Sequence, residues 1–429
     1  MTTLLVFLVI FSIIVVIHEF GHYYFARRSG ILVKEFSLGM GPKLFAKQGK
    51  EGTTYTIRML PLGGYVRLAG LYEEDDIQAG MEVGLRINEN DQVSIINLSE
   101  NFDTNELPIR VDRVDLIDEM VIEGIPVGQS DMVRYSVAKD ASIIEPDGTQ
   151  LPVAPREKRY ESATVWQKIQ TNIAGPINNF ILSIIAFALV ALLVGIPVTD
   201  SVIGEVVADS AAQEAGLVDG DHIQSINGVE VTTWEELVTI IRESPNKELT
   251  MTYDRQGSTN ETVVHVPGVE DANTGESIGQ IGITVGRDKG FFNSVLYGFT
   301  ATWGVITGVI GVLGSMITRG FNINNFGGPV AMAQMTDQVV GLGLPVIINF
   351  LAMLSANLGV FNLLPIPALD GGKIVLNIIE GVRGKPLSES KEGIITIIGV
   401  ILMVILMIAV TWNDINRAFF NKVMLRMYR

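Results

Sequence analysis

Long uncharged runs alternate with polar, highly charged regions along this chain. Three runs contain no Asp, Glu, Lys or Arg and reach 26, 32 and 21 residues, at 173–198, 338–369 and 393–413. A helix needs about 20 apolar residues to cross the hydrocarbon core of a bilayer. The N-terminal run, residues 1–17, is long enough only if its helix continues into the polar residues that follow. The pattern predicts about four transmembrane helices, at residues 1–26, 173–198, 338–372 and 393–413.

The distribution of Lys and Arg predicts how these helices are oriented, because short cytoplasmic loops are rich in both. Basic residues follow the first run, precede the second and precede the last. After the second run come Asp200, Glu205 and Asp209, with no Lys or Arg before Arg242. We therefore expect the loop before the second helix inside the cell and residues 199–288 outside. The basic C-terminal tail is the one exception to this rule.

Two polar regions carry most of the acidic charge. The chain has 31 Lys+Arg, 47 Asp+Glu and no Cys, which argues against a nucleic-acid binder, a disulfide scaffold and a cysteine zinc finger. Residues 71–155 hold 5 basic and 19 acidic residues, and residues 199–290 hold 5 and 17. Alternating apolar and polar positions at 109–116 predict β-structure in the first region. We expect an acidic, cytoplasmic, β-rich insert at 71–160, for which the sequence indicates no function.

His18-Glu19-Phe20-Gly21-His22 forms an H-E-x-x-H pattern at the end of the first apolar run. On a helix, residues i and i+4 lie on one face, so both imidazoles can bind one metal ion. Glu19 can then reach a water at this ion and take its proton. The alternative is a solvated helix end just past the membrane. Ionisable groups at membrane depth are costly unless they have a function, which favours the metal site.

Asp370 is the candidate for a third ligand, because a catalytic zinc takes three protein ligands and a water. It directly follows 32 uncharged residues, where a carboxylate is costly unless it is used. Pro365 and Pro367 break the helix, which is tolerated at membrane depth only where backbone lines protein or a wet cavity. The alternative is an ordinary Asp-Gly turn at a helix end. His222 and His265 are expected on the opposite side of the membrane, as surface residues.

These ligands constrain the path of the chain. His18 lies near the cytoplasmic end of a helix that runs from outside to inside. Asp370 can meet it only if its own span also runs inward, which places the chain before Gln338 outside. Residues 290–318, uncharged and rich in Gly and Thr, then cannot cross the membrane once. We expect residues 290–337 to form extracytoplasmic surface helices or re-entrant helices.

Five motifs together are far more specific than H-E-x-x-H alone. They are H-E-F-G-H at 18–22, G-M-G at 39–41, P-L-G-G-Y-V at 61–66, A-G-P at 174–176 with N-F at 179–180, and N-x-x-P-x-P-x-L-D-G-G at 362–372. With them the chain resembles the site-2 protease family of intramembrane zinc metalloproteases, in its bacterial sigma-regulating branch, over most of its length.

The resemblance implies a zinc ion held by His18, His22 and Asp370, with Glu19 as the catalytic base. It also implies substrates that are single-pass membrane proteins, cut within their transmembrane segments and usually after a first protease has acted. Anti-sigma factors are the usual substrates of the family, and some members process remnants of signal peptides.

A helical substrate hides its amides inside its own hydrogen bonds, so the enzyme must unwind it locally. Residues 36–45 and 53–68 predict a short hairpin near the cytoplasmic face, which can bind an extended segment by strand addition. The resemblance implies that residues 27–70 form a re-entrant, membrane-associated β-loop that contacts substrate; a plain cytosolic hairpin is the alternative. The candidate substrate-binding residues are Gly39, Gly41, Asn362, Pro365 and Pro367. Asn362 is either a hydrogen-bond partner of the unwound substrate or a structural residue beside the prolines.

Residues 199–288 are predicted to form one soluble domain. The segments A-A-Q-E-A-G-L at 211–217 and G-D-H-I-Q-S-I-N-G at 220–228 resemble a PDZ domain. Asn227-Gly228 between apolar residues is typical of a tight hairpin. PDZ domains bind peptides along a sheet edge, so peptide ends are expected partners. Related proteases often use theirs as a size filter for trimmed substrates.

The sequence thus predicts a polytopic α-helical membrane protein with a re-entrant β-hairpin, a cytoplasmic β-rich insert and one extracytoplasmic PDZ domain. We expect it in the cell membrane, in contact with the lipid bilayer, with the active site near the cytoplasmic side and no nucleic-acid partner. A soluble metalloprotease is excluded because the motif is fused to a membrane span. An inactive PDZ-bearing membrane scaffold would not need Glu19. A transporter would show paired repeats with intramembrane charges, which the sequence lacks.

Overall fold

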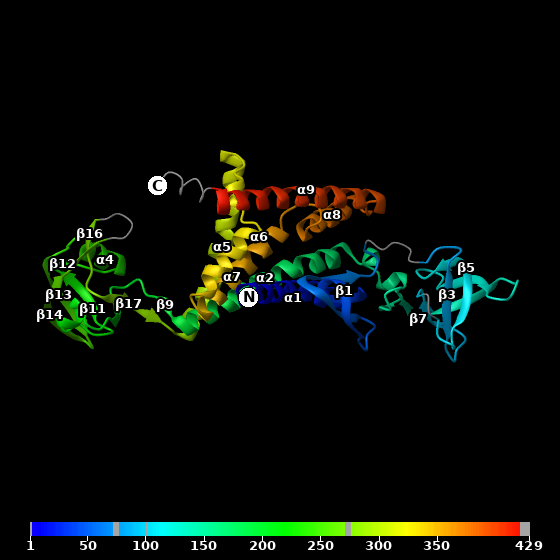
Figure 1. Ribbon diagram of the computed structural model, residues 1–429, viewed down its shortest axis with the longest axis horizontal. Helices are drawn as coiled ribbons and strands as arrows, with labels where there is room; N and C mark the ends of the chain where they lie inside the picture. The colour runs from blue at the N-terminus through cyan, green and yellow to red at the C-terminus, as the bar shows by residue number, and fades with distance from the viewer. Residues whose placement is uncertain (1, 72–76, 100–101, 271–275, 421–429) are drawn as a thin grey trace. The chain divides into compact units, whose positions relative to one another are not determined.

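The computed structural model describes residues 2–71, 77–99, 102–270 and 276–420 of the 429-residue chain (Figure 1). By their internal contacts, the residues fall into two compact units. The first combines residues 1–183 with 302–429, and the second is formed by residues 184–301. Each unit is described by itself below.

Five helices in the described part of the chain are long and apolar enough to cross a membrane. They are α1 (Thr2–Arg28), α2 (Val165–Val194), α5 (Phe291–Arg319), α7 (Leu344–Asn362) and the span Ser390–Ala418, which includes all of α9 (Glu389–Ile415) except its first residue. Four of them overlap the expected spans. The fifth, α5, is one continuous helix in the segment expected outside, and the number of helices that cross stays a prediction.

The region expected as a single span at 338–372 consists of three pieces. The helix α6 (Pro329–Val340) ends before Gly341, and Gly343 adopts a φ of 96° that separates it from α7. A turn at 363–369 then separates α7 from α8 (Asp370–Arg383). The longest uninterrupted helix of the region is therefore α7, with 19 residues. The second break falls at the prolines that predicted it.

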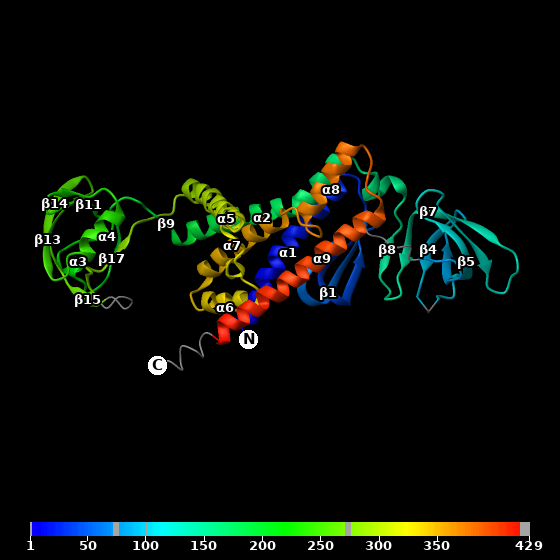
Figure 2. The ribbon, with the colours of Figure 1, turned by 90° about the horizontal axis from the view of Figure 1, so that it is seen from above.

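The helices α1 and α2 pack against each other in opposite directions. Asn178 Nδ2 donates to Ile17 O at 3.0 Å, and His22 Nδ1 lies 2.8 Å from Thr171 O. Residues nearer the end of α1 thus contact residues nearer the start of α2. Figure 2 shows the two helices side by side.

The helix α7 runs parallel to α1. Thr3 Oγ1 donates to Asp337 Oδ1 at 2.7 Å, on α6 just before α7. Further along, Ile10 and Ile14 of α1 form a buried apolar cluster with Phe350 of α7. Both helices therefore run in the same direction, from their N-terminal ends toward the level of the H-E-x-x-H motif.

The predicted hairpin is present, as β1 (Val33–Gln48) and β2 (Thr54–Leu68), and the two strands fold back into a small sheet. Residues 35–38 lie beside 64–67 on one side and beside 54–57 on the other. Residues 43–48 pair with the far side of 54–58. The sheet therefore has one edge at 43–48 and another at 64–68. Its entry into the membrane stays a prediction.

The acidic insert is a small barrel of β-strands. Its sheet has the order β4-β3-β5-β6-β7-β8, and an additional parallel pairing of β4 with β7 closes five strands into a ring. The strands are β3 (Glu82–Ile87), β4 (Val93–Asn97), β5 (Leu107–Asp115), β6 (Val121–Pro126), β7 (Val133–Ile144) and β8 (Gln150–Pro152). Fully buried Leu85, Ile96, Ile109 and Ile122 fill its interior. The β-structure predicted for this insert is confirmed.

The second unit contains one globular β-rich domain. Its main sheet has the order β12-β11-β13-β14, and two short pairs, β10–β17 and β15–β16, lie beside it together with α3 (Ala211–Glu214) and α4 (Trp234–Arg242). These strands are β10 (Ile203–Val206), β11 (His222–Ile226), β12 (Val229–Glu230), β13 (Lys247–Arg255), β14 (Ser258–Val266), β15 (Gly268–Glu270), β16 (Ser277–Gly279) and β17 (Ile283–Val285).

Two short sequence motifs in this domain form a tight turn and a helix cap. Asn227 and Gly228 both have positive φ, at 51° and 77°, as the tight turn between β11 and β12 requires. Thr233 and Glu236 form a capping box at the start of α4. The unit also includes β9 (Ile196–Pro197) paired with β18 (Arg287–Asp288).

Candidate active site

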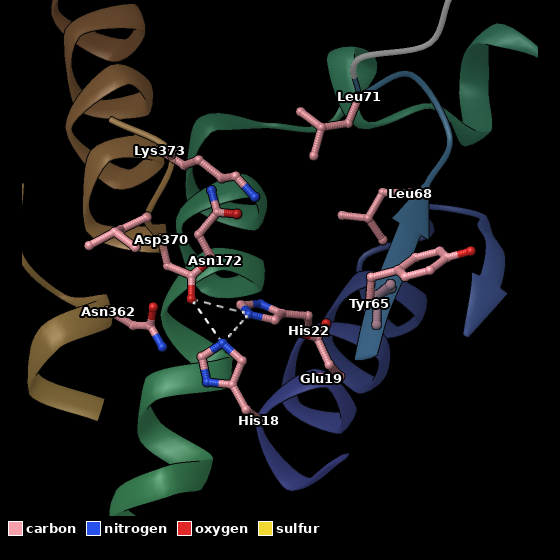
Figure 3. Close-up of a pocket in the computed structure, with 13 residues that line it drawn as sticks. His18, Glu19, His22, Tyr65, Leu68, Leu71, Asn172, Asn362, Asp370 and Lys373 are labelled. Atoms are coloured by element: carbon pink, nitrogen blue, oxygen red, sulfur yellow. Dashed lines mark hydrogen bonds and ion pairs between the residues drawn. The ribbon is translucent and has the colours of Figure 1, made fainter. Parts of the chain in front are cut away.

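Three buried side chains converge at one point in the first unit (Figure 3). His18 Nε2 and His22 Nε2 lie 3.1 Å apart, and Asp370 Oδ2 lies 3.2 Å and 3.3 Å from them. Zinc bonds of about 2.0–2.1 Å at tetrahedral angles separate the ligand atoms by about 3.3 Å. Asp370 Oδ2 is buried and accepts no hydrogen bond within the described ranges. The donor set and its spacing therefore fit a zinc ion.

The outer ring nitrogens fix the direction in which the two imidazoles present their lone pairs. His22 Nδ1 donates to Thr171 O at 2.8 Å, which leaves its Nε2 free to face the centre. The amide of Asn179, itself fully buried, lies 3.1 Å from His18 Nδ1. With the amide oxygen turned to that nitrogen, His18 donates to Asn179 and presents Nε2 inward. This assignment also gives a partner to Asn179 Oδ1, which otherwise has none among the described residues.

Two glycines allow α1 and α2 to approach closely at the ligands. A Cβ on Gly21 would lie 2.4 Å from Ala174 O, and a Cβ on Gly175 would lie 2.3 Å from His22 Nε2. Real Cβ atoms do not approach other atoms that closely. The G of H-E-F-G-H and the G of A-G-P are therefore required by packing at the metal centre.

Asp370 reaches the centre because the chain turns sharply before it. Ala368 has a φ of 79°, and Asp370 begins α8 with its side chain directed at the histidines (Figure 3). A Cβ on Gly371 would lie 2.3 Å from Leu363 O, and one on Gly372 would lie 2.3 Å from Ile366 O. The two glycines after Asp370 thus let the start of α8 pack directly on the turn.

A cavity of about 270 Å³ opens beside the three ligands. Glu19 and the predicted Asn362 line it, together with three polar residues that sequence reasoning did not identify, Tyr65, Asn172 and Lys373. Lys373 follows Asp370 by one helical turn, and this i, i+3 spacing is a local signal that could have identified it. Tyr65 and Asn172 come from β2 and α2, and only the tertiary fold brings them here.

Four of the predicted substrate-binding residues, Gly39, Gly41, Pro365 and Pro367, are not among the described residues that line this cavity. Gly39 and Gly41 adopt positive φ at a bend of β1, where a Cβ on Gly39 would lie 2.6 Å from Leu60 O. Pro365 and Pro367 lie in the turn at 363–369. Their visible role is to shape the backbone around the site.

Tyr65 is held in place from the side opposite the cavity. Its hydroxyl donates to Glu35 Oε2 at 2.7 Å, and Glu35 is 1% exposed. Burial and this hydrogen bond raise the pKa of Tyr65 to about 12. The hydroxyl therefore stays protonated at neutral pH and continues to donate.

His222 and His265, expected as surface residues, lie on β11 and β14, where His222 is half-buried and His265 is exposed. The potential metal-binding cluster found among the described residues is His18, His22 and Asp370, and neither of these histidines belongs to it.

We predict that Asn179→Ala lowers zinc affinity by about 10- to 100-fold, because His18 loses the partner that fixes its tautomer and ring orientation. Zinc retained by the purified variant against increasing chelator measures the effect. Asn178→Ala is the matched control, since Asn178 bonds to the α1 backbone at Ile17 rather than to a ligand. Equal zinc retention by both variants would contradict the role of Asn179.

The fold and the site define a class, a membrane-helix metallopeptidase with an H-E-x-x-H motif. Comparison with known proteins agrees: peptidase family M50 matches residues 6–406. A protein named as a zinc metalloprotease from Lactococcus lactis is 46% identical over 98% of this chain and 99% of its own. The protease Eep of Enterococcus faecalis is 45% identical over 98% and 100%. A Bacillus subtilis protein named regulator of sigma-W protease RasP is 40% identical over 97% of this chain and 99% of its own.

The chain belongs to peptidase family M50, the site-2 protease family, as its motifs predicted. It is an intramembrane metalloendopeptidase, and several of its relatives are named as zinc metalloproteases.

Proposed function

We propose that this enzyme cleaves transmembrane segments of single-pass proteins, such as anti-sigma factors or remnants of signal peptides. The observation that carries the proposal is the position of the three buried ligands: His18 and His22 lie on α1, a helix apolar enough to cross a membrane, and Asp370 meets them from the start of α8. A peptide bond must reach this depth to be cut. The name of RasP, a relative that regulates a sigma factor, supports the first substrate class.

In the proposed reaction, each group of side chains around the cavity has a separate role. His18, His22 and Asp370 hold zinc, which supplies a Lewis acid and an activated water when it is bound. Glu19 accepts a proton from the attacking water and delivers it to the leaving amine. Lys373, the one Lys or Arg among the described residues that line the cavity, stabilises negative charge that develops on the substrate. Asn362 hydrogen-bonds the unwound backbone.

The strand 64–68 presents the substrate to these groups. It is an edge of the hairpin sheet, and in the described part of the chain no other strand pairs with its outer side. Tyr65, Val66 and Leu68 line the cavity together with Glu19. An extended segment added to this edge by main-chain hydrogen bonds lies beside the catalytic residues. Strand addition also keeps the substrate unwound while it is cut.

The second candidate, an inactive membrane scaffold, is less well supported. A scaffold has no need of an acid beside three converging ligands, and Glu19 lines the same cavity as all three. The test is cleavage of a tagged single-pass substrate by the purified enzyme in lipid vesicles. We expect cleavage inside the transmembrane segment, its loss on chelation and its return with added zinc. Cleavage confined to the soluble flanks, or none with zinc loaded, would contradict the proposal.

We propose that α1 and α7 run from outside to inside, with the active site near the cytoplasmic face. The basic residues after α1 support this orientation. Because α2 is antiparallel to both helices, the chain must cross an even number of times between the end of α2 and the start of α7. With 12 residues, α6 is too short to cross. A single crossing by α5 is inconsistent with this count, which favours a position along the outer surface.

Cysteine labelling tests this orientation, since the chain has no Cys of its own. We expect Asn260→Cys, exposed on β14, to react with an impermeant maleimide on intact cells. Asn90→Cys, exposed on the insert, should react only after the membrane is opened. The reverse pattern would overturn the proposed orientation.

We further propose that residues 199–288 act as a PDZ-like domain that binds peptide ends. A groove of about 340 Å³ runs between α4 and the segment 278–283. Trp234, Ile278 and Ile281 give it apolar walls, and Arg242 lies among its lining residues. An extended peptide placed along the 278–283 segment would meet apolar pockets and a positive charge that suits a terminal carboxylate.

A further inference from the structure

The turn between β7 and β8 of the barrel, residues 145–149, lies against the hairpin sheet. Lys43 Nζ donates to Asp147 O and Thr149 Oγ1, both at 2.9 Å. Arg67 Nη1 pairs with Glu145 Oε1 at 2.7 Å. Lys43 belongs to one edge of the sheet and Arg67 to the other. One turn of the insert therefore binds both edges of the sheet.

The two strands that flank this turn, β7 and β8, extend the contact. Gln48 Nε2 donates to Ser142 Oγ at 3.2 Å, and Thr54 Oγ1 donates to Gln150 O. The side chains of Arg67 and Glu145 are 28% and 21% exposed, so solvent screens their pair less than it screens a fully exposed one. The interface is thus a set of specific polar contacts.

The edge strand that the turn binds also lines the catalytic cavity. Arg67 lies between Val66 and Leu68, which face the cavity with Glu19. Tyr65, two residues earlier, donates to buried Glu35, which also accepts from Arg58 Nη2 at 2.8 Å. The strand 64–68 is therefore bound to the barrel through Arg67 and to the rest of the hairpin sheet through Tyr65. It lines the cavity with Tyr65, Val66 and Leu68.

The orientation of the hairpin sheet decides where the strand 64–68 lies, because this strand is one edge of the sheet. A sheet that tilts as a unit would carry the strand 64–68 away from Glu19. A strand that is held less firmly binds an extended segment more weakly, because part of the binding free energy then goes into ordering the strand.

We propose that the acidic insert is a positioning module for substrate: through the Arg67–Glu145 pair and the contacts of Lys43, it fixes the strand 64–68 at the catalytic cavity. This inference rests on the proposed binding of substrate by that strand. Arg67, Glu145 and Lys43 are positioning residues, since none of them touches the ligands. The insert therefore has a role in substrate binding that its sequence does not indicate.

A charge exchange tests this role with the full-length enzyme in vesicles. We expect Arg67→Glu and Glu145→Arg each to raise KM for a tagged single-pass substrate on the order of tenfold, with kcat and zinc content near the wild-type values. The double variant Arg67→Glu/Glu145→Arg should recover most of the loss, because it restores an ion pair of opposite polarity. A merely structural effect would lower zinc content and would not be rescued.

Two further variants keep the test decisive. Arg134→Glu breaks an exposed pair with Glu119 on the same barrel and should leave KM unchanged. If Arg67→Glu yields no folded protein, Glu145→Gln gives the milder version of the same loss. Wild-type KM in both single variants, or no recovery in the double variant, would overturn the inference. Absence of cleavage by the wild-type enzyme would instead refute the proposed function.

Discussion

Glu19→Gln is expected to lower cleavage of a transmembrane substrate by about 10²- to 10⁴-fold, the usual contribution of a general acid–base group. The amide has nearly the same shape as the carboxylate but accepts no proton at neutral pH. The variant therefore keeps the cavity and loses proton transfer from water to the leaving amine. The measurement is the single-turnover rate in vesicles with a tagged single-pass substrate.

Zinc content separates this effect from a loss of the site. Glu19 is not among the three converging ligands, so we expect the variant to bind zinc as the wild-type enzyme does. Asp370→Ala is the contrasting variant, because it removes one of three ligand groups and should lose both zinc and activity. Substantial cleavage by zinc-loaded Glu19→Gln would mean that another group moves the proton.

Gly175→Ala is expected to abolish zinc binding and to lower cleavage by about 100-fold or more. The added methyl group would lie 2.3 Å from His22 Nε2 and 2.8 Å from His18 Cε1. To make room, α2 must move away from α1, and the histidines then lose their outer partners on α2. Metal analysis of the purified variant and its cleavage rate measure the two effects.

The intrinsic effect of this substitution on a helix has the opposite sign. Alanine in place of glycine stabilises a helix interior by about 1 kcal/mol. Gly308→Ala is the matched control, because Gly308 lies inside α5, and beyond the backbone of that helix no described atom lies within 4 Å of the place its methyl group would take. We expect the control to retain zinc and activity. Normal zinc content in Gly175→Ala would show that the helices can separate without disturbing the ligands.

The features that depend on neighbouring residues could be predicted from the sequence. The spacing of His18 and His22 places both imidazoles on one face of α1, and hydrophobic runs locate the long helices. The family and the enzyme class predicted from five motifs are confirmed by the comparisons. The structure brings the three predicted ligands together, and their binding of zinc stays a prediction for metal analysis to test.

The features that depend on distant pairing could not be predicted. Tyr65 and Asn172 reach the cavity because β2 and α2 fold back onto α1, and no local pattern encodes that approach. The barrel closes through the parallel pairing of β4 with β7, whose partners are more than forty residues apart, as in Val93 with Val137. Alternation predicts that such strands exist but does not specify which strands become neighbours.

The closed ring of the insert has a consequence for how the enzyme handles unfolded chains. Exposed strand edges capture extended polypeptide indiscriminately, and barrels abolish them. Under the proposed function, extended substrate segments lie close to the insert during every turnover. The pairing of β4 with β7 closes five described strands of the insert into a ring, and β8 continues the sheet outside it. The closure therefore leaves an unwound segment fewer strand edges to bind beside the strand 64–68.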